Sequence, residues 1–204
     1  MMTDYNTEQL ETLDMIVNVL PRMPEKEIIE LKDSASDYLQ FRQDMASFSD
    51  TYLAPLCKKK CHDTGLSACC TKDGIITYFT DMVLNVLFSD EKKISILKNT
   101  LSRSNTHTTC VYLSEKGCLW TIKPIVCEMF FCDWLIEESS VTDASFARQI
   151  EAFRIRQKLY TWPDKPVFFN TVETLFLEKG IESSLMYFHF SPGLKQIKKK
   201  AGVQ

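Results

Sequence analysis

Apolar residues in the first quarter of the chain recur at the three- and four-residue spacing of amphipathic helices. The first series ends before Pro21 and consists of Leu10, Leu13, Val17 and Leu20. The second follows Pro24 and consists of Ile28, Leu31, Ala35, Tyr38, Phe41, Met45, Phe48 and Tyr52. We predict a short helix and then a long one, which starts near Pro24 and ends at Pro55. We expect its apolar stripe to pack in the core rather than to form a binding groove.

The later parts of the chain predict further helices. Residues 75–101 indicate two helices separated near Ser89 and Asp90, either of which could cap the second helix. Residues 142–160 and 167–180 are again amphipathic. Helices therefore flank the middle of the chain on both sides.

The middle of the chain has a different pattern. Residues 108–118, TTCVYLSEKGC, hold a short β-prone run and then Ser-Glu-Lys-Gly, which indicates a small hairpin or looped strand. Pro124 is placed to start a short helix. The predicted fold is mainly α, with helices flanking a loop-rich cysteine-cluster centre that has at most a small hairpin. We expect a single domain, 1–204, with N-terminal helices in 1–56, the cysteine-cluster region in 57–132 and C-terminal helices in 133–204.

Composition and charge narrow the possible functions. The chain has 204 residues, 45% of them hydrophobic, which is enough for a substantial core. Its net charge of −3 gives no general attraction to nucleic acids or anionic membranes. The basic segment 195–200 lacks interleaved aromatic residues, so we do not expect nucleic-acid binding. Residues 1–10 lack the features of a signal peptide, and the apolar run 82–88 is too short to span a bilayer, so we expect a cytoplasmic protein without membrane contact.

The cysteines are confined to one part of the chain. All eight lie in the cysteine-cluster region, at Cys57, Cys61, Cys69, Cys70, Cys110, Cys118, Cys127 and Cys132. Structural disulfides are rare in a reducing cytosol, where grouped cysteines more often bind metal, and cysteines used as small core residues would be scattered. Thiolates bind zinc or hold iron–sulfur clusters, each with four ligands as a rule. Eight cysteines could therefore form two full sites, or one site with some cysteines left over.

The spacing of the cysteines favours paired ligands. Cys57 and Cys61 lie one turn apart, on one face if the segment is helical. Cys127-x4-Cys132 is a comparable close pair. Cys69 and the adjacent Cys70 tend to diverge, so one of them could serve a different metal or none.

Two features beside the cysteines have a functional and an ordinary interpretation. The run of lysines at 58–60 could offset the charge of bound thiolates, or it could be a solvated surface. The aromatic residues Phe130, Phe131 and Trp134 could shield a cluster from water, or they could be ordinary core. Both interpretations stay open for each feature.

The segment 110–132 resembles the second half of the YkgJ-like cysteine-cluster family, whose members are described as chelators of zinc or iron. That family has a glycine before a cysteine, followed by Arg-Pro-x-x-Cys and a closing cysteine. Lys123 stands where the arginine is usual. The matching positions are Cys110, Gly117, Cys118, Pro124, Cys127 and Cys132. The resemblance implies metal chelation, with all eight cysteines as candidate ligands. We expect Cys118, Cys127 and Cys132, which lie in the matching segment, and at least one of Cys69 and Cys70 to be ligands.

The first half of the family is a compact CxxCxxCC, and this chain has a looser version of it. Cys57-x3-Cys61-x7-Cys69-Cys70 keeps the terminal double cysteine but not the spacing. The family does not fix the metal, so an iron–sulfur cluster or zinc is expected. Some relatives resemble flagellin lysine N-methylases, which keeps a protein-modifying or redox enzyme as an alternative. This chain shows neither CxxxCxxC nor GxGxxG, the signatures of two methylase classes.

A third alternative is an interaction module, in which zinc holds loops together and the helical flanks bind a protein partner. The histidines add little to the choice. His62 follows Cys61 and could be a ligand or a proton carrier, although a surface position is the ordinary interpretation. His107 and His189 show no pattern, and no cysteine is singled out as a nucleophile, so the catalytic residues stay unknown.

Overall fold

Helices make up most of the structure, and the prediction of a mainly α fold is confirmed. The computed structural model describes residues 4–65, 70–71, 76–103, 108–142, 145–161 and 167–190. Within these residues the β-structure is limited to one two-stranded hairpin and one isolated bridge. No helix in the described ranges is both long and apolar enough to cross a membrane.

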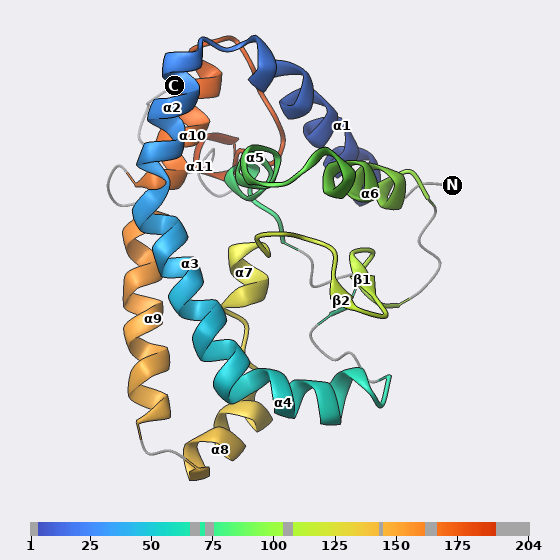
Figure 1. Ribbon diagram of the computed structural model, residues 1–204, viewed down its shortest axis with the longest axis vertical. Helices are drawn as coiled ribbons and strands as arrows, with labels where there is room; N and C mark the ends of the chain where they lie inside the picture. The colour runs from blue at the N-terminus through green and yellow to red at the C-terminus, as the bar shows by residue number, and fades with distance from the viewer. Residues whose placement is uncertain are drawn as a thin grey trace, which may run out of the picture.

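The N-terminal part is helical, as the apolar spacing predicts. Its elements are α1 (Asp4–Val19), the 3-10 turn η1 (Leu20–Arg22), α2 (Glu25–Ser34) and α3 (Ser36–Phe48). Pro21 lies in the 3-10 turn that ends α1, and Pro24 precedes the first turn of α2. Ala35 separates α2 from α3, but its backbone keeps helical angles, with φ −81° and ψ −12°. The long predicted helix is therefore present as two nearly continuous pieces (Figure 1).

The prediction that Pro55 ends this helix is wrong. Helical structure continues through the π-helical turn η2 (Ser49–Leu53), then α4 (Ala54–Cys57) and a second π-helical turn, η3 (Lys58–His62). Pro55 lies in the first turn of α4, where a missing backbone N–H is tolerated because that group has no partner within the helix. The first pair of cysteines is consequently carried on helical rather than looped backbone.

The middle of the chain confirms three local predictions. Its elements are α5 (Phe79–Phe88), α6 (Glu91–Leu101), β1 (Leu113–Ser114), β2 (Gly117–Cys118) and α7 (Ile125–Glu128). Asp90 caps α6, because its carboxylate accepts a hydrogen bond from the backbone of Lys93 at 2.8 Å. Gly117 has φ +101°, a conformation that favours glycine, and it closes the hairpin turn. Pro124 precedes α7, as expected.

The C-terminal part contains two predicted helices and two that the apolar spacing misses, α8 and the short α11. Its elements are α8 (Asp133–Thr142), α9 (Phe146–Thr161), α10 (Phe168–Leu177) and α11 (Tyr187–Phe190). The helices α9 and α10 match the predictions for 142–160 and 167–180. Helix α8 was missed because its pattern is irregular: Trp134 is 40% exposed, whereas Leu135 and the polar Ser139 are buried.

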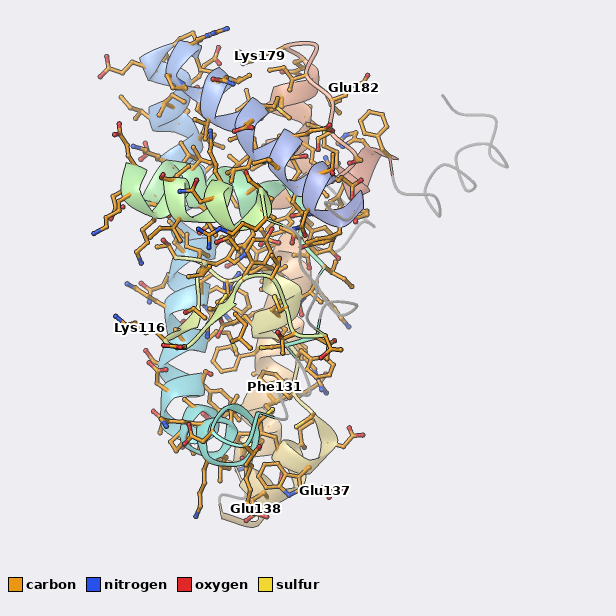
Figure 2. All side chains as sticks on the ribbon, turned by 90° about the vertical axis from the view of Figure 1, so that its right-hand side faces the viewer. Lys116, Phe131, Glu137, Glu138, Lys179 and Glu182 are labelled. Carbon is orange, nitrogen blue, oxygen red and sulfur yellow. The ribbon has the colours of Figure 1, made fainter. Side chains whose placement is uncertain are left out.

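The buried side chains form two cores. The first core lies among α1, α5, α6 and α10, and the second lies among α3, α7, α8 and α9. In Figure 1, α3 and α9 run side by side, and the hairpin and α7 lie between the α1–α6 end and the α8 end. Figure 2 shows the same length from the side, with Lys179 and Glu182 at one end and Glu137 and Glu138 at the other. The predicted stripe is confirmed as core, since every member from Leu31 to Phe48 is buried.

Candidate metal centre

Seven of the eight cysteines lie within the described residues, and these seven are thiols rather than disulfides. Cys69 lies outside the described residues, as do His107 and the side chain of His62. We call four of the thiols, which surround the hairpin and α7, the hairpin thiols: Cys70, Cys110, Cys118 and Cys127. We call the other three, which lie on α4, on η3 and before α8, the helix thiols: Cys57, Cys61 and Cys132.

Backbone contacts bring three hairpin thiols together from different parts of the chain. The N–H of Cys110 donates to the carbonyl of Cys70 at 2.8 Å, and the flanking residues Thr71 and Thr109 form a β-bridge. Cys110 also accepts, through its carbonyl, from the N–H at position 113, which is the register partner of Cys118 in the hairpin. A segment that precedes α5 is thereby held alongside the hairpin that follows α6.

Cys127 approaches the same region from α7. Burial is the main cause of the raised pKa of Tyr5, and Cys110 and Cys127 add to it electrostatically, so both thiols lie within electrostatic range of the Tyr5 hydroxyl. Tyr5 is hydrogen-bonded to Thr77, with 3.1 Å between their hydroxyl oxygens. The neighbouring Tyr112 is buried, and its pKa is raised by burial first and then by the Tyr5 charge, with Cys110 adding to the shift. Tyr112 belongs to the first core, and Tyr5 and Cys110 pack against it.

Burial favours the protonated form of two hairpin thiols, Cys110 and Cys118. Burial raises the pKa of Cys110 to about 11, and the charge of Cys118 raises it further. Cys118 is an exposed residue, yet desolvation by the atoms around its thiol raises its pKa, and the charge of Lys123 opposes the shift. At neutral pH these groups would lose protons on binding a cation, which makes metal affinity depend on pH.

Helix α5 fixes the segment between Cys118 and Cys127. The side chain of Asn85 accepts from the N–H groups of Thr121 and Ile122, both at 3.1 Å, and donates to the carbonyl of Ile122 at 2.8 Å. Asp81, one turn earlier, accepts from the N–H of Ile125 at 3.2 Å. Asn85 and Asp81 are fully buried. Two polar side chains of one helix therefore satisfy the backbone of the segment that joins two thiols.

Helix α3 holds the far end of the same segment through a buried charge. Arg42 is 6% exposed, and it donates to the carbonyl of Lys123 at 2.6 Å and to the hydroxyl of Tyr38 at 2.8 Å. The Arg42 guanidinium also lies 3.5 Å from the Glu128 carboxylate, which Lys123 approaches to 3.6 Å from the other side. The lysine at the position where the resembling family has arginine thus pairs with the last residue of α7.

The helix thiols lie against the other core. Cys57 and Cys132 both pack against the second core, whereas Cys110 packs against the first. The carbonyl of Cys132 accepts hydrogen bonds from the first turn of α8, at 3.0 and 3.1 Å. Lys60 and Trp134 join η3 to α8, with the ammonium 6.0 Å from the ring centroid. The segments that carry Cys57 and Cys132 are therefore neighbours in space.

Neighbouring residues of the lysine run, 58–60, make different contacts, and the aromatic residues near Cys132 differ in exposure. Lys58 forms an ion pair with Asp63 at 2.7 Å, whereas Lys60 contacts an aromatic ring. Phe131, labelled between the two ends of the molecule in Figure 2, is 8% exposed and belongs to the second core. Phe130 is 56% exposed. The expectation that these residues protect a metal site stays a prediction.

The donor chemistry fits a thiophilic metal. Thiols are the ligands that zinc and iron–sulfur clusters share, and the hairpin thiols supply four from three chain segments. Within the described ranges, no three His, Cys, Asp or Glu side chains already stand close enough together to hold an ion. The described residues that would hold a metal are the hairpin thiols and the helix thiols.

One buried polar pair was missed by the sequence analysis. Glu173 of α10 is fully buried, and its carboxylate lies 2.7 Å from the Nδ1 atom of His189. Burial raises the pKa of Glu173 to about 8, and backbone hydrogen bonds from positions 188 and 189 oppose this shift. The sequence signal for this pair was the single acidic residue in the apolar stretch FFNTVETLFL.

No family model, curated protein or solved structure matches the chain.

Proposed function

We propose that the protein binds zinc or an iron–sulfur cluster through cysteine thiolates, with the hairpin thiols as its principal ligands. The observation that supports this most directly is the backbone contact between Cys70 and Cys110, which joins two cysteine segments that are forty residues apart in the sequence. Cys118 follows in the same hairpin. The resemblance of residues 57–132 to the YkgJ-like family supports the same proposal.

The chain's own residues would prepare the ligands for the metal. Asn85, Asp81 and Arg42 fix the backbone between Cys118 and Cys127, which lowers the entropy lost when these thiols bind. Lys123 supplies a positive charge near Cys118 that favours the thiolate. A bound zinc ion would crosslink the segments, and an iron–sulfur cluster would add a site for electron transfer. Cysteines kept as thiols fit the proposed cytoplasmic location.

An interaction module is the second candidate, and one observation favours it. Phe130 is 56% exposed and Trp134 is 40% exposed, and both flank Cys132. Large aromatic residues on the surface are enriched where proteins contact partners. In this case zinc would hold the loops, and the exposed aromatic residues would contact a protein partner. A colourless preparation with stoichiometric zinc would favour this candidate, whereas visible absorption from a cluster would favour the redox alternative.

The proposal is tested by metal analysis of protein purified without oxygen. We expect bound zinc or iron in the wild type, and a lower metal content in Cys118→Ser and Cys127→Ser. Lys116→Ser is the matched control. Lys116 is exposed at the hairpin turn, so this substitution introduces a serine next to the site without removing a thiol (Figure 2). Folded wild-type protein without metal, or full metal content in both cysteine variants, would refute the proposal.

A further inference from the structure

The thiols fall into two groups that belong to different parts of the fold. Cys110 packs against the first core, together with the α1 and α5 residues that form it. Cys57 and Cys132 pack against the second core, beside residues of α3 and α8. In Figure 1 the hairpin lies above α4 and α8.

Each group is held together by contacts of its own. The backbone hydrogen bond from Cys110 to Cys70 and the strand register of the hairpin join the segments that carry the hairpin thiols. The contact of Lys60 with the Trp134 ring joins the segments that carry the helix thiols. These two sets of contacts involve separate elements of the fold.

Each group also has a cation near it. Lys123 acts on Cys118 among the hairpin thiols. Lys60 precedes Cys61 in the sequence, and its ammonium lies over the ring of Trp134, two residues after Cys132. Several thiolates on one divalent ion leave a net negative charge, which a nearby ammonium stabilises. Two local cations therefore suit two anionic centres.

The division separates two cysteines that are close in the sequence. Cys127 lies on α7, within electrostatic range of the Tyr5 hydroxyl, as Cys110 does. Cys132 lies five residues later, where its carbonyl begins α8 and its side chain joins the second core. Cys127 is exposed and belongs to neither core, whereas Cys132 packs against the second core.

We propose that the hairpin thiols and the helix thiols form two separate metal centres rather than one shared centre. This inference rests on the proposed function, and it answers how the cysteines divide between sites. Binding at each centre would replace thiol protons with a metal ion and release those protons to solvent, with no change in oxidation state for zinc.

The test adds Zn²⁺ alone to the reduced full-length chain and maps which thiols become protected from alkylation by mass spectrometry. Wild type, Cys110→Ser and Cys57→Ser are compared, with Lys116→Ser as the matched control. We expect Cys110→Ser to raise the alkylation rates of the remaining hairpin thiols at least tenfold while the helix thiols stay protected. We expect Cys57→Ser to have the reverse effect.

The pair Cys127→Ser and Cys132→Ser repeats the comparison with substitutions at α7 and at the start of α8, in case either first variant fails to fold. Loss of protection in both groups after a single substitution, in variants with native far-UV circular dichroism, would overturn the two-centre inference and leave the proposed function intact. Protection of one group alone in the wild type would also overturn it. Failure of zinc to protect any thiol in the wild type would overturn both.

Discussion

Replacing Asn85 with alanine tests whether α5 holds the segment between Cys118 and Cys127. The substitution removes the acceptor of two backbone N–H groups, at Thr121 and Ile122, and the donor to the carbonyl of Ile122. Asn85 is fully buried, so water cannot easily take its place. Each of these partly buried hydrogen bonds contributes about 1 kcal/mol, which gives about 3 kcal/mol for the three.

A smaller opposing effect comes from the helix itself. Alanine favours helix over asparagine by roughly 0.6 kcal/mol, so the net loss expected for Asn85→Ala is about 2–3 kcal/mol in the free energy of unfolding. Urea unfolding followed by circular dichroism measures this loss, with Asn99→Ala on the exposed face of α6 as the matched control. Metal content should fall in Asn85→Ala under conditions where the variant remains folded.

The reasoning fails if Asn85→Ala and Asn99→Ala have free energies of unfolding within about 0.5 kcal/mol of each other, the range typical of surface substitutions. It also fails if Asn85→Ala is destabilised but keeps full metal content and affinity. In that second case the α5 contacts would serve folding alone and would not position the thiols.

Three further predictions concern the buried charges and the centre of the chain. Arg42→Met should lower the free energy of unfolding by about 3 kcal/mol, because it leaves the buried Glu128 with Lys123 as its cationic partner, whereas the exposed Arg148→Met should have little effect in the same urea assay. The pKa of buried Glu173 is raised to about 8, whereas its unfolded value is about 4.3. The free energy of unfolding of the wild type, relative to Glu173→Gln, should therefore decrease by up to about 1.4 kcal/mol per pH unit between pH 6 and 8. A difference that does not change with pH, as expected for the exposed Glu182→Gln, would contradict the raised pKa of Glu173. A chelator that strips the metal should expose residues 57–72 and 104–133 to protease before the far-UV helical signal falls, and loss of both in one step would show that the helices depend on the metal.

The apolar spacing was sufficient for most of the fold, because it reports which face of each helix is buried. The stripe from Leu31 to Phe48 and the cap at Asp90 are local features, and both are present as predicted. The continuation of the helix through Pro55 was not predictable, because the π-helical turns η2 and η3 depend on tertiary packing rather than on propensity. Local patterns therefore located the elements but not every boundary between them.

The candidate site was harder to predict from the sequence than the fold. The confinement of eight cysteines to residues 57–132 was visible in the sequence. The backbone hydrogen bond between Cys110 and Cys70, however, joins positions whose spacing carries no periodic signal. The roles of Asn85 and Arg42 were also hidden, since each contacts a segment more than thirty residues away. Such contacts arise from how α3 and α5 pack, which single-sequence patterns do not encode.

The central claim is that cysteine thiolates of this chain hold a metal. X-ray absorption spectroscopy at the zinc and iron edges, on wild-type protein purified without oxygen, tests it most directly. The account predicts a metal–sulfur distance of about 2.3 Å, the value for thiolate ligands, with sulfur as the dominant ligand. A folded protein without metal, or a metal bound by oxygen and nitrogen alone, would contradict it.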